Sequence, residues 1–544
     1  MKKYFFRHKT IFILACLISV IHAVINVLIA FILSGMINAA IDRSMTSLRV
    51  YTSFSITYIL LVLLIGSVSN YFQRLFAQKV IQELRHDAFH ALLNMDYQTF
   101  NGKPIGEYIS LLTNDIDAIE SSYIDALFSI VNAIVTFIVA LVSLISIDYL
   151  IILFALIVGA IYVLITSLLS NRITYHKDSW FRSLERYTIR IKELLSGYEV
   201  ISNFDLSESV EKSFHAVNEE EGNKKRIFSV KMENLGVINL ALGQGLILAI
   251  LVMGAVLVIT DRLLVGDLIA VAQLLTNLIT PLVGLVSCIN EMKSSQNIKQ
   301  QIIELINGAT ARTQSNELFL SDFKEKIEFQ NVSFSYGETE DVLSNLTFII
   351  RKNKKYAIIG SSGSGKTTLC KLVMNYYSQY EGKMLIDGHD YREISPACFS
   401  RLFSITQQNI FLFDGTIRDN ITLFGEFSHD QIAEAIRIAG LQEFFVRTGQ
   451  TLDSVISENG SQLSGGERQR IAIARSYLMG RNILIFDEAT SALDKNVASE
   501  ILSGILKTPN LTCITVTHKL DEVDRMLYDE IWEIRDNRLN IAMM

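Results

Sequence analysis

Six long runs of apolar residues in the first 290 positions constrain the fold of this chain more than any other feature. Each run exceeds about 18 residues without Asp, Glu, Lys or Arg, which is long enough for a helix to cross a bilayer. The runs cover residues 11–41, 50–73, 126–147, 149–171, 234–260 and 268–290. One such run also fits the core helix of a soluble protein, whereas six of them favour a membrane domain. We therefore predict six transmembrane helices within residues 1–305.

Composition agrees with a chain that lies partly in the lipid bilayer. Half of the residues are hydrophobic and only 19% are charged, whereas soluble domains average about 25% charged residues. The net charge of −7 leaves no basic surplus, so no nucleic acid is expected as a partner. The five cysteines show no CxxC spacing, which argues against a zinc site or a disulfide framework.

The loops between the runs predict the orientation of the chain. The short links are 42–49, 148 and 261–267, and the long loops are 74–125 and 172–233. The N-terminus and the long loops hold 19 Lys and Arg, against three in the short links. Because positive residues favour the cytoplasmic side, we expect a multi-pass protein of the bacterial plasma membrane with both termini cytoplasmic. Helical spacing in the long loops predicts that the helices continue there, with short transverse helices or plain turns at the breaks near 101–106 and 196–207.

A second domain follows the last apolar run. Residues 306–325 are polar and are interpreted as a linker, and from Lys326 the pattern changes to short alternating strands. A buried strand at 355–359 leads into GSSGSGKTT at 360–368, which fits the phosphate-loop pattern G-x-x-x-x-G-K-[ST]. We therefore predict an α/β P-loop nucleotide-binding domain over residues 326–544.

The phosphate loop predicts a site for ATP and Mg²⁺. Its glycines let backbone amides turn toward phosphate groups, Lys366 reaches the β and γ groups, and Thr367 offers its hydroxyl to Mg²⁺. The helix that begins at Lys366 also points its positive end at the anion. Lys366 is thus a catalytic candidate as well as a binding one. The candidate nucleotide-binding residues of the loop are Gly360, Ser361, Ser362, Gly363, Ser364, Gly365, Lys366, Thr367 and Thr368.

Two carboxylates follow another apolar strand. Residues 482–486 lead into Asp487 and Glu488. A strand that delivers two acids to its end supplies one for a metal ion and one for an attacking water. We assign Asp487 to Mg²⁺ and Glu488 to the role of general base, with ordinary acidic residues at a strand end as the alternative.

The segment LSGGERQR at 463–470 predicts a second phosphate-binding surface. Ser464, Gly465 and Gly466 begin a helix, so a hydroxyl and free amides lie at its positive end. Two such surfaces with only one lysine loop are difficult to explain in a monomer.

Together these motifs resemble the ATP-binding cassette (ABC) transporters, and specifically exporter-type half-transporters. The phosphate loop, LSGGERQR and ILIFDEATSALD carry the resemblance, which extends over essentially all 544 residues. It implies an all-α polytopic membrane domain of six long helices followed by an α/β P-loop NTPase domain of the ABC type. It also implies a dimer in which Ser464, Gly465, Gly466 and Glu467 of one chain close over the ATP held by the other.

The resemblance implies roles for further residues. Tyr336 matches the aromatic residue that stacks on adenine. Gln408 matches the glutamine that contacts Mg²⁺, although Gln407 leaves that register open by one. Asp494 matches the loop that crosses the dimer interface, and His518 matches the histidine that contacts the γ-phosphate. The breaks near 106–114 and 201–206 fall where exporters carry coupling helices.

The resemblance implies ATP-driven export by alternating access. The six runs contain no Asp, Glu, Lys or Arg, which argues against a strongly charged cargo at mid-membrane. We expect a small peptide or a hydrophobic or amphipathic compound to move out of the cytoplasm. The alternatives are a lipid or drug flippase, an importer of the same architecture, and a membrane-anchored regulatory ATPase without net transport. Because Glu488 and LSGGE are intact, a homodimer is favoured over a heterodimer.

Overall fold

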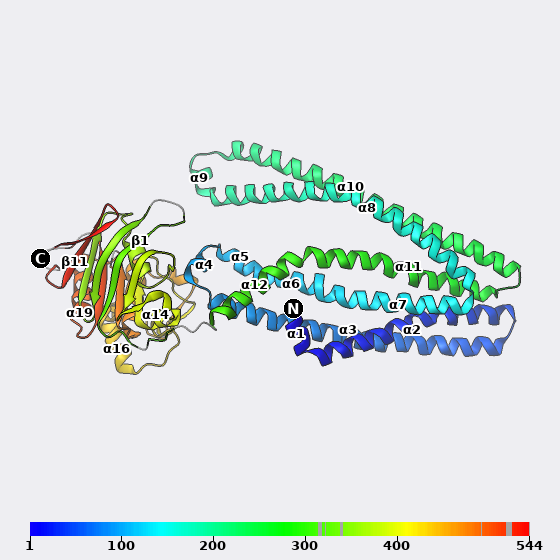
Figure 1. Cartoon of the computed structure of the whole chain (residues 1–544), viewed down its shortest axis with the longest axis horizontal. Helices are drawn as coiled ribbons and strands as arrows, with labels where there is room; N and C mark the ends of the chain where they lie inside the picture. Colours follow the sequence, from blue (N-terminus) through cyan, green and yellow to red (C-terminus); the bar gives the residue numbers. More distant parts are fainter. Residues whose placement is uncertain are drawn as a thin grey trace. The chain divides into compact units, whose positions relative to one another are not determined.

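The chain forms two compact units, which Figure 1 colours along the sequence. The computed structural model describes residues 1–313, 318–320, 322–337, 341–490, 492–517, 520 and 525–542. One unit is helical and comprises Met1–Leu93 and Ile105–Ala309, and the other comprises Asn94–Pro104 and Thr310–Met544. The second unit therefore includes a short segment of the first long loop.

Long helices joined by short turns make up most of the helical unit. In chain order the helices of the first 313 residues are α1 (Lys2–Arg7), α2 (Lys9–Ile41), α3 (Met45–Leu93), α4 (Tyr97–Asn101), α5 (Ile105–Ser110), η1 (Leu111–Asp115), α6 (Ile116–Ile119), η2 (Glu120–Asp125), α7 (Ala126–Ile147), α8 (Tyr149–Ser196), α9 (Tyr198–Asn203), α10 (Ser207–Ile259), α11 (Val265–Ser294) and α12 (Gln296–Thr313). Residues 306–313 of the predicted linker 306–325 therefore belong to α12. The six predicted spans fall on α2, α3, α7, α8, α10 and α11.

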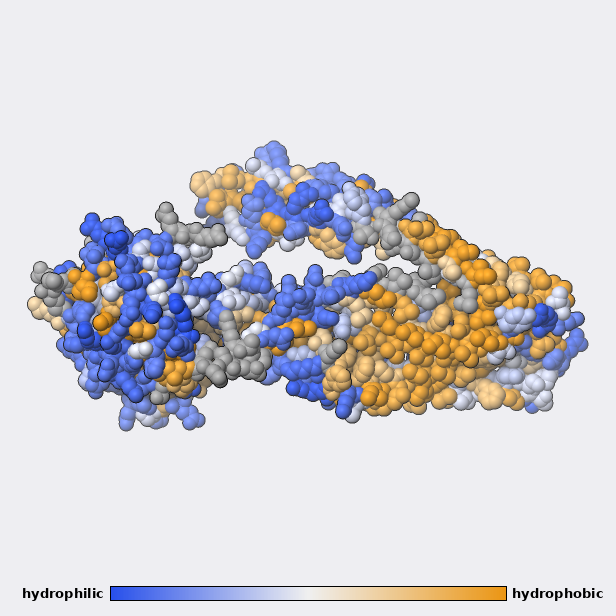
Figure 2. All heavy atoms as spheres, viewed as in Figure 1, coloured by the Kyte–Doolittle hydropathy of each residue, from blue (hydrophilic) through white to orange (hydrophobic). Residues whose placement is uncertain are grey.

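Four helical stretches of the described residues are long and apolar enough to cross a membrane. They are α2, α3, Ile105–Ile147 and α10, while α8 and α11 supply the shorter apolar stretches Tyr149–Tyr162 and Val265–Pro281. On the face drawn in Figure 2, apolar side chains form a broad zone over the helical unit. Large apolar side chains of the long helices are exposed, such as Leu60 and Leu64 of α3 and Val252 of α10. An apolar surface of this extent suits lipid rather than water.

Small residues allow the helices of this unit to approach one another closely. α2 lies against α3 and α11, and α7 lies against α11. A Cβ atom at Gly266 would lie only 2.3 Å from the carbonyl oxygen of Ser34.

The second long loop continues two of the membrane helices. α8 and α10 run side by side, and Trp180 stacks on Phe228 with ring centroids 5.3 Å apart. Most of the second long loop is therefore helical, as predicted.

A short helix marks the turn of each long loop. α4 begins after Asp96, whose carboxylate accepts the backbone N–H of Thr99 at 2.8 Å. The chain cannot continue this helix through Pro104, which has no backbone N–H. α9 follows Gly197 at the turn of the second loop. Residues 106–114, where the resemblance placed the first coupling helix, form part of α5 and η1, and residues 201–206, where it placed the second, overlap α9.

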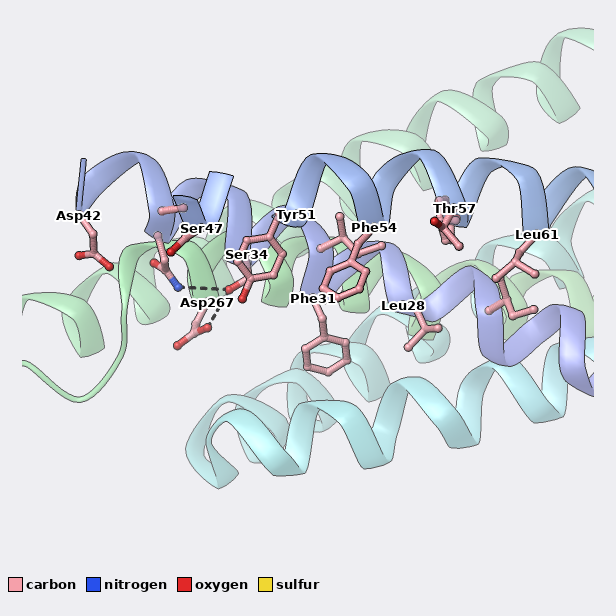
Figure 3. Close-up of a pocket in the computed structure, with 16 residues that line it drawn as sticks. Leu28, Phe31, Ser34, Asp42, Ser47, Tyr51, Phe54, Thr57, Leu61 and Asp267 are labelled. Carbon is pink, nitrogen blue, oxygen red and sulfur yellow. Dashed lines mark hydrogen bonds between the residues drawn. The ribbon is translucent and has the colours of Figure 1, made fainter. Parts of the chain in front are cut away.

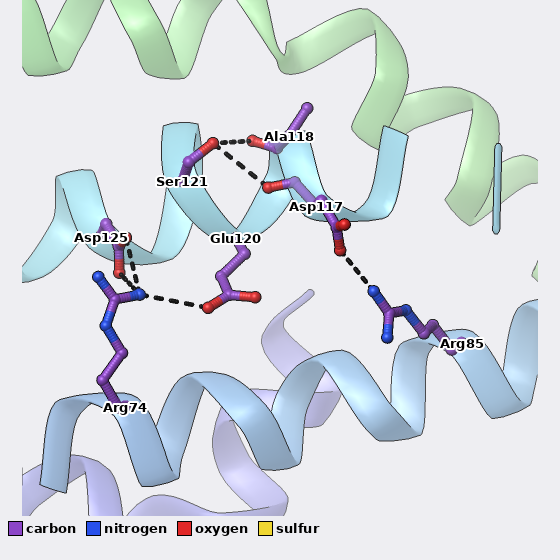
Figure 4. A network of polar contacts seen from close by, with 7 residues as sticks. All are labelled: Arg74, Arg85, Asp117, Ala118, Glu120, Ser121 and Asp125. Carbon is purple, nitrogen blue, oxygen red and sulfur yellow. Dashed lines mark hydrogen bonds and ion pairs between the residues drawn. The ribbon is translucent and has the colours of Figure 1, made fainter. Parts of the chain in front are cut away.

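Two π-helical turns, η1 and η2, interrupt the helix that leads into α7. In an α-helix, residues five apart are separated by about 140° around the axis, whereas the i→i+5 pattern of a π-turn brings them to one face. Glu120 and Asp125 of η2 therefore both reach Arg74 of α3, at 3.2 and 3.1 Å (Figure 4). Arg85 pairs with Asp117 farther along the same two helices. The π-turn η2 thus brings two carboxylates to one arginine of α3, and Asp117 of α6 adds a second ion pair between these helices.

The second unit contains two sheets and the helices around them. Its strands are β1 (Lys326–Phe334), β2 (Leu343–Arg351), β3 (Lys355–Gly360), β4 (Glu381–Ile386), β5 (His389–Asp390), β6 (Phe403–Thr406), β7 (Gly415–Thr416), β8 (Val455–Ile456), β9 (Ile483–Asp487), β10 (Thr512–Thr517), β11 (Glu530–Arg535) and β12 (Arg538–Ala542). Its helices are α13 (Lys366–Val373), η3 (Tyr391–Glu393), α14 (Pro396–Leu402), α15 (Ile417–Thr422), α16 (His429–Ile438), α17 (Leu441–Thr448), η4 (Glu458–Gly460), α18 (Gly465–Leu478) and α19 (Lys495–Leu506).

The larger sheet positions the site. Its strand order is β12-β11-β3-β10-β9-β6, and the smaller sheet has the order β2-β1-β4-β5. β3, β6, β9, β10 and β11 run parallel, so their carboxyl ends meet at one edge. Residues of both sheets share one core, where Tyr356 of β3 and Trp532 of β11 have ring centroids 4.5 Å apart. The predicted alternation in β1 is confirmed, because Ile327 and Phe329 are buried in that core.

Candidate functional site

The phosphate loop connects β3 to α13 at the carboxyl edge of the larger sheet. Gly363 and Gly365 have φ angles of 80° and 97°, in the left-handed region that glycine adopts without strain. Lys366 is 5% exposed. Its ammonium donates hydrogen bonds to the carbonyl oxygens of Gly360 at 3.0 Å and Ser361 at 2.8 Å. The loop therefore folds around its own cation.

Hydroxyl groups line the same loop. Ser361, Ser362 and Thr367 are exposed, while Thr368 is buried in the first turn of α13. The Ser364 hydroxyl is buried and has no hydrogen-bond partner among the described residues. Together with the backbone amides at the start of α13, these hydroxyls form a surface suited to an anion with several oxygens.

Asp487 ends β9 beside this loop and is 4% exposed. The Thr367 hydroxyl hydrogen-bonds its carboxylate, but its Oδ1 is buried without a hydrogen-bond partner in the described part of the chain. Burial raises the pKa of Asp487, the bond from Thr367 opposes this, and the charge of Glu488 raises the pKa further. An unpaired buried oxygen is costly unless a cation binds it. Because hydroxyl and carboxylate oxygens are ligands that Mg²⁺ prefers, these residues fit that ion.

The protein would share such an ion with phosphate oxygens. Among the described residues, no group of three or more His, Cys, Asp or Glu side chains could hold a metal ion by itself. Mg²⁺ commonly binds through one or two protein oxygens plus the phosphates of a nucleotide. The pair Thr367 and Asp487 matches that pattern.

Glu488 has a φ angle of 53°, in the left-handed region that non-glycine residues rarely adopt. Its backbone N–H still donates to the carbonyl of Val516 in β10 at 3.2 Å, although β9 ends one residue earlier, at Asp487. Its carboxylate accepts a hydrogen bond at 2.9 Å from the side-chain amide of Gln408. Backbone strain of this kind is characteristic of functional sites. The contact supports Gln408 rather than Gln407 as the predicted glutamine.

Tyr336 lies beside the phosphate loop. Its hydroxyl shares a hydrogen bond with Oγ1 of Thr368 at 3.0 Å and accepts one from Tyr377 at 3.4 Å. Phe334 meets the ring edge-on, with centroids 5.0 Å apart, and Tyr336 is 45% exposed. An exposed aromatic face that is anchored at its hydroxyl is suited to stacking on a nucleobase.

The second predicted phosphate surface begins α18. Ser464 caps the helix: its hydroxyl accepts the N–H of Glu467 at 3.3 Å, and the Glu467 carboxylate accepts the N–H of Ser464 at 2.8 Å. Arg447 holds the other carboxylate oxygen of Glu467. The backbone at Gly466 lies close to Ala492, whose carbonyl oxygen would be 3.1 Å from an added Cβ atom. This capping leaves the hydroxyl hydrogen of Ser464 available to a ligand.

Of the two remaining predicted residues, Asp494 lies among the described residues and His518 does not. Asp494 is exposed and precedes α19 without capping it through its side chain. The segment before it is tied to α18, because Gln469 accepts the N–H of Ala492 at 3.0 Å. His518 and Ser491 lie outside the described residues.

A tyrosine cluster next to Tyr336 was not predicted from the sequence. Tyr97 of α4 stacks on Tyr376 with ring centroids 4.1 Å apart and an interplanar angle of 20°, and the ammonium of Lys371 lies 5.5 Å from the Tyr97 ring. Tyr377, next to Tyr376, hydrogen-bonds Tyr336. Burial raises the pKa of Tyr377, and its bond with Tyr336 raises it further, so the phenol remains a neutral donor. The paired tyrosines after the phosphate-loop helix were the available signal.

A cavity of about 680 Å³ lies beside this cluster. Tyr97 and Gln98 of α4, Tyr336, and Tyr377 and Tyr380 line it. The first long loop therefore contributes residues to the surroundings of the adenine candidate Tyr336. The contact lies within one compact unit, since Asn94–Pro104 belongs to it.

Comparison with known proteins gives consistent matches over both units. The family model described as "ABC transporter transmembrane region" matches residues 12–282, and the one described as "ABC transporter" matches residues 343–491. A solved structure of a bacterial Atm1-family ABC exporter with ATP bound has a TM-score of 0.84 at 22% identity, and the match covers 98% of this chain and 94% of that chain. This likeness shows the fold.

Relatives match over most of their length. An "ATP-dependent lipid A-core flippase" of Syntrophus aciditrophicus (strain SB) is 30% identical over 481 residues, covering 86% of this chain and 78% of the relative. Its namesake from Haemophilus ducreyi is 30% identical over 493 residues, covering 88% and 84%. The Escherichia coli (strain K12) protein of that name is 28% identical over 477 residues, covering 86% and 81%.

Proposed function

The chain belongs to the ABC transporters, as an exporter-type half-transporter, and from this premise we propose that it is an ATP-driven lipid flippase. It is an integral membrane protein whose nucleotide-binding domain hydrolyses ATP to drive transport. The arrangement of Lys366, Asp487 and Glu488 at one sheet edge is the observation that carries the ATP-driven part of the proposal.

A lipid is supported as cargo by the relatives and by the surface of the helical unit. The relatives that span most of this chain are named for lipid A-core. They favour the lipid alternative over the peptide or drug predicted first from the sequence. The exposed apolar zone of the helices suits a cargo that enters from the bilayer. We take a membrane lipid as the substrate class.

Hydrolysis transfers a phosphoryl group from ATP to water. Glu488 accepts the proton of the attacking water, while the amide of Gln408 holds its carboxylate. Lys366 and the amides at the start of α13 offset the negative charge of the phosphates. Mg²⁺, when bound by Asp487 and Thr367, supplies further neutralisation of that charge. Tyr336 positions the nucleotide by stacking on its base.

We assign the second phosphate surface to the partner protomer. Ser464 is exposed, and its hydroxyl lies with the amides of Gly465 and Gly466 at the start of α18, where a helix end favours an anion. They serve ATP held on the phosphate loop of a second copy of this chain. Asp494 lies at the same interface, and Glu488 is intact in both copies of such a homodimer. Both termini lie in the cytoplasm, as the positive residues favour.

The proposal is tested by ATP-dependent movement of a fluorescent phospholipid between leaflets of vesicles that contain the purified protein. We expect Glu488→Gln to reduce ATP turnover and lipid movement by about 100-fold or more, because a general base contributes at least that much. Glu500→Gln, an exposed change on α19, is the matched control and should retain both.

Other outcomes would redirect the assignment. ATP turnover that depends on Glu488 but moves no lipid would favour a regulatory ATPase. Turnover stimulated by peptides and not by lipids would restore the peptide exporter. A loss of turnover in the Glu500→Gln control would mean that the assay reports folding rather than catalysis.

A further inference from the structure

A pocket of about 670 Å³ lies among α2, α3 and α11, within the helical unit (Figure 3). It is at the end of the helices where the short links join them, since Asp42 and Ser47 line it. We propose that this pocket binds an amino lipid, with the ammonium of the head group at Asp267 and an acyl chain along Leu28 and Phe31. This inference rests on the proposed lipid transport and names the class of lipid.

A chain of hydrogen bonds holds Asp267 at the polar end of the pocket. The buried hydroxyl of Ser34 donates to Oδ1 of Asp267 at 2.9 Å, and the amide of Asn38 donates to Ser34 Oγ at 3.4 Å (Figure 3). The other end of the Asn38 amide accepts the N–H of Gly266 at 2.8 Å. The carboxylate is therefore fixed by neighbours that are neutral. Asp267 lies in the first turn of α11, where the helix dipole favours the charged carboxylate, and the donors named above bring no positive charge to it.

The charges of the pocket have one sign. Of the 16 lining residues, Asp42 and Asp267 are acidic, and none of these lining residues is Lys or Arg. Arg262, in the next link, pairs instead with Asp148 at 3.4 Å. Asp42 caps the C-terminal end of α2, where the helix dipole disfavours a negative charge. Two carboxylates at the membrane edge favour a cation and disfavour a purely anionic head group.

Aromatic side chains extend the same preference. Tyr51 and Phe54 of α3 and Phe31 of α2 line the pocket beside its polar end. Tyr51 comes so close to α2 that a Cβ atom at Gly35 would lie 2.2 Å from its ring. Aromatic faces attract ammonium groups, most strongly where water is excluded. Gly35 thus lets the Tyr51 ring pack directly against α2, next to Ser34, which holds Asp267.

The opposite end of the pocket is apolar and open to the lipid-facing surface. Leu28 and Leu61 line that end and are each more than one third exposed, while Phe31 and Phe54 lie between it and the polar end. An acyl chain that covers these side chains removes their apolar surface from contact with water. A polar carboxylate end and an apolar end in one pocket match the two parts of an amphiphile. The pocket would select the lipid by its amine.

The experiment measures lipid retained by the purified full-length protein, which requires no ATP turnover. Protein is extracted from vesicles of phosphatidylglycerol that contain equal amounts of phosphatidylethanolamine and its N-acetylated form, and the retained lipids are counted by native mass spectrometry. We expect wild type to retain the free amine about fivefold over the acetylated lipid, the factor for an exposed ion pair of about 1 kcal/mol. Equal retention would overturn the proposal without the need for any variant.

Variants locate the effect. Asp267→Asn keeps an acceptor for Ser34 but removes the charge, so it should retain both lipids equally. Asp261→Asn makes the same change in the neighbouring exposed link, outside the pocket, and should keep the wild-type preference. A preference that survives in Asp267→Asn would refute the site. Basal ATP turnover of both variants is measured separately, so a failure of lipid selection is distinguishable from a failure of ATP-driven transport.

Discussion

Removing the aromatic ring of Tyr97 should uncouple lipid from ATP turnover. Tyr97 stacks on Tyr376 at 4.1 Å, under the ammonium of Lys371. A stacked aromatic pair contributes about 0.5–1.5 kcal/mol beyond burial, and an exposed cation–π contact about 0.5 kcal/mol. Tyr97→Ala therefore weakens the attachment of α4 by about 1–2 kcal/mol, a factor of roughly 5–30 in the attached population. Basal ATP turnover should stay within about twofold, because Tyr97 lies outside the catalytic residues. Stimulation of ATP turnover by lipid should fall by a factor of roughly 5–30.

The assay compares ATP hydrolysis with and without lipid for three variants. Tyr97→Phe keeps the ring and should retain the stimulation. Gln98→Ala changes an exposed neighbour on α4 that lines the same cavity and serves as the matched control. Equal stimulation in Tyr97→Ala and Gln98→Ala would refute the reasoning, and a fall of basal turnover in Tyr97→Ala would place the ring in catalysis rather than in coupling.

Two further predictions concern charged residues. Asp487→Asn should raise the thermal midpoint of the nucleotide-free protein at pH 7–8, because a buried unpaired carboxylate oxygen costs about 1 kcal/mol or more. The raised pKa of Asp487 means that the folded state binds this proton more tightly than the unfolded state, so stability falls as pH rises through that pKa. The gain in the midpoint of Asp487→Asn should therefore vanish at acidic pH. A gain independent of pH would contradict this. Arg74→Ala should lower the thermal midpoint by the equivalent of about 0.5–1 kcal/mol at low salt and by much less at about 1 M salt, because its ion pairs with Glu120 and Asp125 are exposed. A salt-independent loss would point to packing of the arginine stem.

The nucleotide-binding unit was predictable because its chemistry is local in sequence. Gly363, Gly365 and Lys366 lie within a few residues, and their backbone requirements leave few other interpretations. Asp487 and Glu488 follow a strand of uninterrupted apolar residues, which a parallel sheet buries on both faces. The roles of Gln408 and His518 came from resemblance, and only Gln408 lies among the described residues.

Contacts between distant segments were not predictable in the same way. No periodicity relates Tyr97 to Tyr376, because their stacking depends on where two separately folded segments meet. The π-turns at 111–125 were missed since an apolar pattern does not distinguish one extra residue per turn from a regular helix. Asp267 was not predictable for a related reason: it lies one residue before the uncharged run 268–290, and only the packing of α2 on α11 brings it to Ser34.

The length and continuity of helix α3 have mechanical consequences. It runs for 49 residues, Met45–Leu93, without a proline. At a rise of 1.5 Å per residue it forms a rod of about 74 Å, so a tilt of only about 5° at its Leu93 end would displace its Met45 end by about 6 Å. That is more than the width of a methylene chain, and Tyr51 and Phe54 lie near the displaced end. A small rotation where the rod meets α4 would therefore act as a lever on the walls of the pocket at its other end.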